Sequence, residues 1–378
     1  MFVNGEVGEL LKLMVDKGAS DLHLTVPSPP VFRIDGVLMP QEDLPPLAAK
    51  DIEFAFEKIS TEEQRAAFGR EWDLDFAYSV PGLARFRVSA LQQRGTISLA
   101  FRLVPSNVPA VDELGLPQIC KELVLKPRGL ILVTGHAGSG KSTTLAAMIN
   151  HLNENERRNI ITIEDPIEYL FRNERCIIRQ RDLGDDAKSF SAALTHVLRH
   201  DPDVIVIGEM RDIDTISIAI TAAETGHLVL GTLHTVDAAQ SIDRIIDTFP
   251  PSQQRQIRLQ LAQVVEAVLA QTLLPRIDGG RIAAFEVMLA TSVIRRLIRE
   301  EKIHEIPANI EMGILEGMQT LDQALADLVR NGIVTQEEAM MKSSSPVKLN
   351  ELLQPARYDA LLSTDSGKKD LEVEDTRS

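Results

Sequence analysis

Residues 135–142 read Gly-His-Ala-Gly-Ser-Gly-Lys-Ser, the pattern G-x-x-x-x-G-K-S. An apolar run at 129–134 comes before this stretch, and a helix-forming run at 143–153 follows it. The stretch therefore lies at a turn from a strand to a helix, which is the context of a phosphate-binding loop. Glycines there let backbone N–H groups curl around phosphate oxygens, and the helix N-terminus adds a positive dipole. By itself the loop predicts that the chain binds the phosphates of ATP or GTP.

The loop also supplies side chains for the chemistry of the phosphates. Lys141 is expected to reach the β- and γ-phosphates, and Ser142 is expected to ligate Mg²⁺. The alternative, a Gly-rich turn that arises by chance, is disfavoured by the strand and the helix on either side. The nucleotide-binding residues predicted in this way are Gly135, His136, Ala137, Gly138, Ser139, Gly140, Lys141, Ser142 and Thr143.

Three further apolar runs extend the core around this loop. They span residues 159–164, 203–207 and 228–232. Strands that alternate with helices indicate a parallel sheet. The run 204–207 reads Val-Ile-Val-Ile, as expected where helices cover both faces of a sheet. The fold class predicted for this part is α/β, a RecA-like or related doubly wound core.

Acidic residues follow two of these runs. Glu209 comes after the run 203–207, which resembles a Walker B strand, and Gly208 stands where many P-loop enzymes carry Asp. Glu209 is therefore expected to serve the metal alone or through a water molecule. Glu164 ends the run 159–164, where a carboxylate could orient the attacking water. The alternatives are a polar strand end and a charged turn, and these residues leave open which carboxylate activates water.

Two of the eight histidines bracket one core strand. His227 comes directly before the run 228–232, and His234 follows it after one further residue. Both could lie near the nucleotide at the ends of that strand, and a structural role is the alternative. Their spacing implies no metal site.

The first 105 residues carry short alternating runs broken by Pro and Gly, which favours a mixed α/β domain. A hairpin is expected from residues 84–91 and 96–104, with its turn at Gln93 and Arg94. Beyond it we expect a proline-containing linker at 106–128, the nucleotide-binding core at 129–290, a helical part at 291–354 and a disordered tail at 355–378.

Four arginines lie on the expected hairpin, namely Arg85, Arg87, Arg94 and Arg102. In the expected register Arg85 lies opposite Arg102 and shares a face with Arg87. Like charges placed in this way destabilise a sheet unless an anion neutralises them. A phosphate of ATP bound by a neighbouring subunit would be such an anion, which would make these residues arginine fingers. Spacing alone favours the alternative, a solvated strand face.

Composition excludes several classes of protein. The 378 residues carry a formal net charge of −15, which argues against a general nucleic-acid binder. The two cysteines, Cys120 and Cys176, are far apart and provide neither a disulfide framework nor a Cys₄ zinc site. We see no signal peptide and no apolar run near the roughly 20 residues that span a bilayer. A cytoplasmic location is the simplest expectation.

Together these blocks resemble the type IV pilus retraction ATPases, the PilT family of the secretion ATPases. The segments that carry the resemblance are 18–24, 135–144, 161–169, 208–212, 222–235 and 317–325. The resemblance covers residues 1 to about 350 and leaves the tail outside. One departure lies at 293–300, which reads Val-Ile-Arg-Arg-Leu-Ile-Arg-Glu where the family often has Ala-Ile-Arg-Asn-Leu-Ile-Arg-Glu.

The resemblance implies a homohexameric ring in which each subunit has a PAS-like α+β N-terminal domain and a RecA-like domain, with ATP bound between them. It assigns Glu164 to the Asp box, Glu209 to Walker B, and His227 and His234 to the His box. It makes the N-terminal arginines sensors or fingers. It also implies an inner-membrane platform protein of the pilus machine as partner, at the cytoplasmic face, with pilus retraction and twitching motility as the result.

There are four alternatives to a retraction ATPase. The departure at 293–300 keeps an accessory, PilU-like retraction ATPase open. A pilus assembly or type II secretion ATPase usually has a longer N-terminal extension and a tetracysteine module, which this sequence lacks. A RecA-like nucleic-acid motor is disfavoured by the charge of −15. A regulatory module without turnover is disfavoured by the set Lys141, Glu164 and Glu209.

Overall fold

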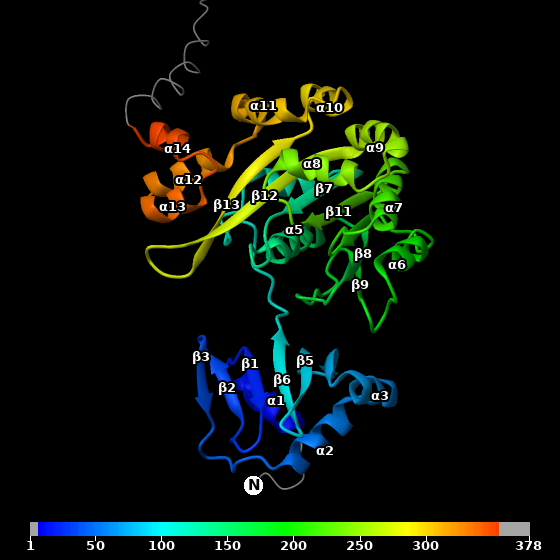
Figure 1. The fold of residues 1–378 in the computed structure, drawn as a ribbon, viewed down its shortest axis with the longest axis vertical. Coiled ribbons are helices and arrows are strands. Elements are labelled where there is room, and N and C mark those ends of the chain that lie inside the picture. The colour runs from blue at the N-terminus through cyan, green and yellow to red at the C-terminus, as the bar shows by residue number, and fades with distance from the viewer. Residues whose placement is uncertain (1–6, 355–378) are drawn as a thin grey trace, which may run out of the picture. The chain divides into compact units, whose positions relative to one another are not determined.

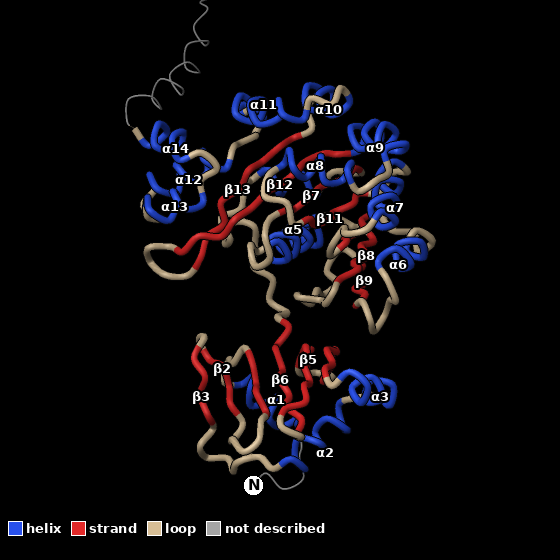
Figure 2. Tube along the Cα trace, viewed as in Figure 1, coloured by secondary structure: helices blue, strands red, loops and turns tan. Residues whose placement is uncertain are grey.

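The computed structural model describes residues 7–354, and the chain divides into two compact units. The first unit consists of Met1–Val108, Ile163–Arg172 and Ile178–Ala193, and the second of Pro109–Thr162, Asn173–Ile177 and Leu194–Ser378. The strands gather into two sheets, drawn in red in Figure 2.

The first sheet has six strands in the order β3-β2-β1-β6-β5-β4, and the paired neighbours run antiparallel. Three helices accompany it (Figure 1). The elements are α1 (Val7–Asp16), β1 (Asp21–Leu24), β2 (Val31–Ile34), β3 (Val37–Pro40), α2 (Ala49–Ile59), α3 (Glu62–Glu71), β4 (Asp73–Val80), β5 (Ala84–Gln93) and β6 (Thr96–Val104). Phe32, Phe86 and Phe101 are fully buried in its core. The mixed fold class predicted for the N-terminal part is confirmed.

The expected hairpin is β5 and β6, but its predicted register is wrong. The strand continues to Gln93, and the two turn residues are Arg94 and Gly95, with φ of +46° and +80°. A two-residue hairpin turn needs positive φ at both positions, and glycine adopts it readily. Moving the turn by one residue shifts the pairing by two, so Arg102 lies opposite Arg87 and not opposite Arg85.

The second sheet has seven strands in the order β13-β12-β7-β11-β10-β8-β9. β12, β7, β11 and β10 run parallel, and β13 runs antiparallel to β12. The strands are β7 (Gly129–Thr134), β8 (Asn159–Glu164), β9 (Ile177–Asp182), β10 (Val204–Ile207), β11 (Leu228–Leu233), β12 (Val265–Pro275) and β13 (Arg281–Leu289). Every residue of β7, β10 and β11 is buried, as expected for strands covered on both faces. The predicted α/β core is confirmed.

Helix α4 (Ile119–Val124) precedes the second sheet, and further helices connect its parallel strands. They are α5 (Lys141–Asn155), α6 (Phe190–Val197), α7 (Ile213–Glu224), α8 (Ala238–Asp247) and α9 (Pro251–Val264). The helix expected at 143–153 is α5, which begins two residues earlier, at Lys141. No helix within residues 7–354 is both long and apolar enough to cross a bilayer.

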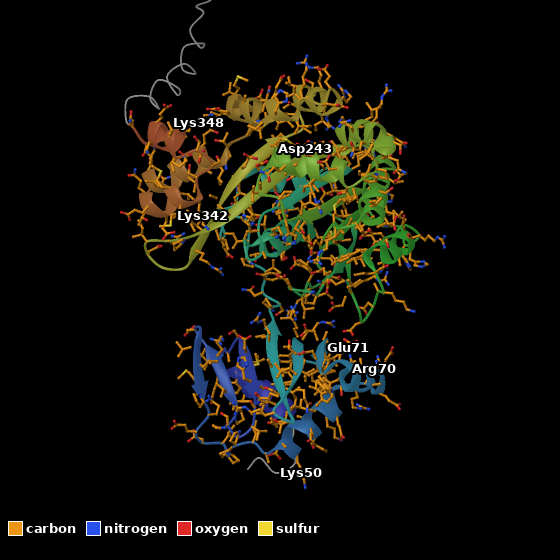
Figure 3. The ribbon with its side chains drawn as sticks, in the orientation of Figure 1. Lys50, Arg70, Glu71, Asp243, Lys342 and Lys348 are labelled. Carbon is orange, nitrogen blue, oxygen red and sulfur yellow. The ribbon has the colours of Figure 1, made fainter. Side chains whose placement is uncertain are left out.

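Short helices follow the second sheet, as the pattern after residue 290 predicts. They are α10 (Ser292–Arg299), η1 (Ile303–Glu305), α11 (Ile306–Met312), η2 (Ile314–Glu316), α12 (Leu321–Arg330), α13 (Gln336–Lys342) and α14 (Pro346–Leu353). Lys348 of α14, labelled in Figure 3, forms an ion pair with Glu311 of α11 at 2.6 Å. The tail expected to be disordered, 355–378, lies outside the described residues.

Candidate functional site

The loop between β7 and α5 has the backbone shape that a phosphate-binding loop needs. Gly135 has φ of +142°, and Gly140, at the N-cap of α5, has φ of +90°. Residues with side chains strongly disfavour both conformations. A Cβ atom on Gly135 would also lie 2.4 Å from the carbonyl oxygen of Gln271 on β12. Only glycine therefore lets the loop turn against β12 at position 135.

Lys141 folds back over this loop. It is the first residue of α5, and its Nζ atom donates to the carbonyl oxygens of Gly135 at 2.9 Å and His136 at 3.1 Å. The ammonium group therefore stands beside the exposed residues 136–138. A cation at the N-terminus of a helix strongly favours an anion at this place. Ser142 follows in the first turn of α5 and is partly exposed.

A histidine and a glutamate meet at the same edge of the second sheet. Leu233 at the end of β11 pairs with Thr134 at the end of β7, so His234 and the loop begin side by side. Glu209 lies two residues beyond the end of β10, the neighbour of β11. The Nε2 atom of His234 lies 2.9 Å from Oε1 of Glu209. The structure thus brings together two of the predicted site residues.

The surroundings of Glu209 keep its carboxylate ionised. Its side chain is 18% exposed, and burial works to raise its pKa. The Nε–H group of Arg211 donates to Oε1, and His234 adds a second contact, so the pKa of Glu209 lies below its ordinary value. An ionised carboxylate at this edge can serve a divalent cation directly or through water.

Gly231 on β11, the neighbouring strand, leaves room for the segment that follows β10. The N–H group of Met210 donates to the carbonyl oxygen of Thr232 at 3.0 Å, which ties the segment after β10 to β11. A Cβ atom on Gly231 would lie 2.4 Å from the Sδ atom of Met210. Because Gly231 has no side chain, Met210 packs over β11, and Glu209 is held next to His234.

His227 lies at the opposite edge of the sheet. Leu228, the next residue, pairs with Gly129 at the start of β7, and Gly129 donates its N–H group to the carbonyl oxygen of His227 at 3.0 Å. The Nδ1 atom of His227 lies 2.9 Å from the carbonyl oxygen of Ala222, near the end of α7. β11 separates the two histidines by its full length, so the structure does not bring His227 to the loop of its own subunit.

Glu164 occupies the strand end that the sequence predicts, as the last residue of β8. The Nε2 atom of Gln180, on β9, donates to Oε1 of Glu164 at 3.1 Å. The same atom donates to the carbonyl oxygen of Tyr169 at 2.7 Å. These contacts tie the segment after β8 to β9 and orient the carboxylate of Glu164.

The hairpin arginines face carboxylates of the same unit. The ion pairs are Arg85 with Asp182 at 2.8 Å, Arg87 with Asp75 at 3.1 Å and Arg102 with Asp21 at 2.8 Å. Arg87 and Arg102 lie opposite each other, and each forms an ion pair with an aspartate. This corrects the electrostatic argument from spacing, because the sheet requires no external anion. Arg94 lies in the exposed turn.

Two residues of this region carry contacts that the motif analysis did not predict. Arg211 engages Glu209 from two positions further along the chain. Gln271 donates from its Nε2 atom to the carbonyl oxygen of Ser139 at 2.6 Å. The signal for Gln271 is visible in the sequence, because it is a lone amide in a run of apolar residues on β12. Arg211 gives no comparable signal on its own.

Comparisons with known proteins agree on one group of relatives. The type II/IV secretion system protein family matches residues 3–279. The type IV pilus retractation ATPase PilT of Pseudomonas aeruginosa is 46% identical over 341 residues, which cover 90% of this chain and 99% of that protein. The type IV pilus ATPase PilU of the same organism is 42% identical, over 90% and 89%. A crystal structure of the pilus retraction motor PilT with bound ADP matches with a TM-score of 0.85 and 43% identity, over 91% of this chain and 99% of that one.

Proposed function

The chain belongs to the type II/IV secretion system protein family and, within it, to the type IV pilus retraction ATPases, and on that premise we propose that it is a hexameric motor. It hydrolyses ATP to ADP and phosphate and couples this reaction to pilus disassembly, retraction and twitching motility. The observation that carries the proposal is the edge of the second sheet, where the loop that Lys141 contacts follows β7 and the ionised Glu209 follows β10.

The loop and its neighbours supply the groups that phosphoryl transfer to water needs. Lys141 and the amides of residues 135–140 hold the β- and γ-phosphates. Ser142 and Glu209 present a hydroxyl and a carboxylate, oxygen donors of the kind that Mg²⁺ takes together with phosphate oxygens and water. When bound, Mg²⁺ neutralises charge on the phosphates. These two residues therefore fit the metal.

Two carboxylates are candidates for orienting the attacking water, Glu164 and Glu209. His234 and Arg211 engage Oε1 of Glu209 and fix its orientation, which supports a role for His234 in positioning that carboxylate. Gln180 fixes Glu164 in a similar way. Since each carboxylate is oriented by a neighbour, both remain proposed for this role.

Membership of the family supports a proposal about the assembly. We propose a homohexameric ring in which arginines of the first unit reach the nucleotide of a neighbouring subunit. The proposed partner is an inner-membrane platform protein of the pilus machine, reached by peripheral binding at the cytoplasmic face. A role as accessory, PilU-like motor is the second candidate. It is favoured by the departure from the family motif at Val293 and Arg296, which are both exposed on α10 while Ile294 and Leu297 are buried.

One variant tests the activity and the biological role together. Lys141→Ala should abolish ATP hydrolysis by the purified protein, because the β- and γ-phosphates lose their cation. A matched control is Lys50→Ala, on the exposed surface of α2 (Figure 3). In cells that lack the native gene, the control allele should restore twitching, whereas the Lys141→Ala allele should leave static, abundant pili. Full turnover in Lys141→Ala would refute the site, and loss of pili on deletion would point to an assembly motor.

A further inference from the structure

The buried amide of Gln271 braces the phosphate-binding loop from the neighbouring strand. We infer that Gln271 is a positioning residue, whose side chain holds the peptide between Ser139 and Gly140 so that the Gly140 N–H group faces the nucleotide phosphates. The inference rests on the proposed function and deepens it, since it names a residue outside the loop motif that prepares the loop for its ligand.

Gln271 lies where β12 passes the start of the loop. β12 runs parallel to β7, and Ala270 pairs with Thr134, the last residue before Gly135. Gln271, the residue after Ala270, therefore lies level with the start of the loop. Its side chain is buried, with 4% of the residue exposed. The Nε2 atom donates to the carbonyl oxygen of Ser139 at 2.6 Å, across 132 positions of sequence.

This contact determines where the next amide points. A trans peptide is planar, and its C=O and N–H groups point in opposite directions. Because the carbonyl of Ser139 points at Gln271 on β12, the N–H group of Gly140 points away from β12. Within residues 7–354 this N–H group donates to no other group. The amide is thus left available for an anion at the N-terminus of α5.

The side chain of Gln271 uses one of its two polar atoms, Nε2, for the contact with Ser139. Ser139 presents an acceptor, so the amide must turn its NH₂ group toward the loop, and Oε1 stays buried without a hydrogen-bond partner among the described residues. An unsatisfied buried acceptor costs stability, so the Oε1 atom of Gln271 contributes nothing to the stability of the fold itself. The loop is also pressed against this residue, because a Cβ atom on Gly140 would lie 3.2 Å from Nε2. The contact with the Ser139 carbonyl explains why a glutamine suits this position.

The test compares substitutions that keep the volume of the side chain but change its polarity. Gln271→Met removes both polar atoms, and Gln271→Glu replaces the donor by an acceptor that faces the carbonyl of Ser139. The matched control is Thr272→Ala, whose side chain lies on the other face of β12. The measurements are the Kd of a fluorescent ADP analogue, ATP turnover and the Tm of the nucleotide-free protein.

Both variants of Gln271 should bind ADP roughly tenfold more weakly or worse, with Gln271→Glu the weaker. The nucleotide-free Tm of Gln271→Met should stay near the wild-type value, because the substitution removes the unsatisfied Oε1 acceptor but also takes the donor away from the Ser139 carbonyl. Thr272→Ala should bind ADP as the wild type does. A lower Tm with unchanged Kd in Gln271→Met would reduce Gln271 to a packing role and overturn the inference. Absence of nucleotide binding by the wild-type protein would instead refute the proposed function.

Discussion

At the scale of single residues, Glu286 is a carboxyl group in an unfavourable place for charge. It lies on β13, and its Oε1 atom accepts the N–H group of Ala238, the first residue of α8, at 2.7 Å. Burial raises the pKa of Glu286 to about 7, and the charges of Asp237 and Asp322 add to this shift. The segment that Glu286 anchors begins four residues after His234, so this carboxyl also helps to fix the loop that follows β11.

The protonation of Glu286 predicts a pH-dependent stability. In the unfolded chain its pKa is 4.5 and in the folded chain about 7, so the folded state binds the extra proton. The stabilisation is fully present below pH 4.5 and is lost as the pH rises through about 7. Because the group is only partly buried, we expect a loss on the order of 2 kcal/mol.

Glu286→Gln tests this prediction, since the amide oxygen can still accept from Ala238. The free energy of unfolding of the wild type, measured in urea between pH 5 and pH 8, should fall relative to that of the variant as the pH rises. Parallel curves for the two proteins would show that Glu286 has an ordinary pKa in the folded state.

Among the residues of the candidate site, the loop can be predicted from the sequence, and the contact between Glu209 and His234 cannot. The loop pattern predicts a strand-to-helix turn, because the glycines and the flanking apolar runs determine it locally, and the structure has that turn between β7 and α5. The approach of His234 to Glu209 depends on how Met210 packs over Gly231. Such a contact between side chains on two strands has no periodic signature in the sequence.

At the scale of elements, the strands of the core are predictable and the hairpin register is not. Strands β8 and β10 coincide with the apolar runs to within one residue, because most of their residues are buried and apolar. In the hairpin, alternation indicates which side chains share a face, and Phe86 and Val88 share the buried face of β5. The alternation has a period of two residues. When the turn moves by one residue, the pairing shifts by two, and the same side chains still face the core. Only the positive φ of Arg94 and Gly95 decides the register.

The C-terminal helices are joined by one buried carboxylate. Asp322 on α12, 3% exposed, accepts from the hydroxyls of Ser343 at 2.6 Å and Ser344 at 2.7 Å, and from the backbone N–H groups of Ser344 and Ser345 at 3.1 Å each. These residues form the connection from α13 to α14. The carboxylate thus orders the connection in a region that has a small apolar core of its own.

Asp322→Ala should destabilise this region by about 2 kcal/mol, because several donors lose their acceptor at once. Hydrogen exchange of residues 343–353 should speed up, while exchange in α5 stays as in the wild type. The control is Asp327→Ala, a carboxylate of the same helix that pairs with Arg330 at 3.4 Å at the surface. Equal exchange rates in the two variants would show that Asp322 does not hold α14.

At the scale of the whole molecule, the arginines and the phosphate-binding loop belong to different units. Arg87 is in the first unit and Lys141 in the second. The side chain of Arg87 is 42% exposed, and its partner Asp75 is 58% exposed, so this ion pair is weak and Arg87 can exchange it for a phosphate. In the proposed ring, a nucleotide held by Lys141 of one subunit meets Arg87 of the next.

This arrangement predicts rescue between two inactive variants. Arg87→Ala and Lys141→Ala should each lose turnover as pure proteins, for lack of the finger and of the phosphate cation respectively. In rings assembled from an equal mixture, about a quarter of the interfaces combine an intact Lys141 with an intact Arg87, so turnover should return to about that fraction of the wild-type rate. Mixing Lys141→Ala with Arg70→Ala, a variant of an exposed arginine on α3 (Figure 3), should give about half, because Arg70 takes no part in the reaction. No activity in the first mixture, with the expected activity in the second, would place Arg87 and Lys141 at the same subunit's nucleotide, since only sites built within one chain escape rescue by mixing.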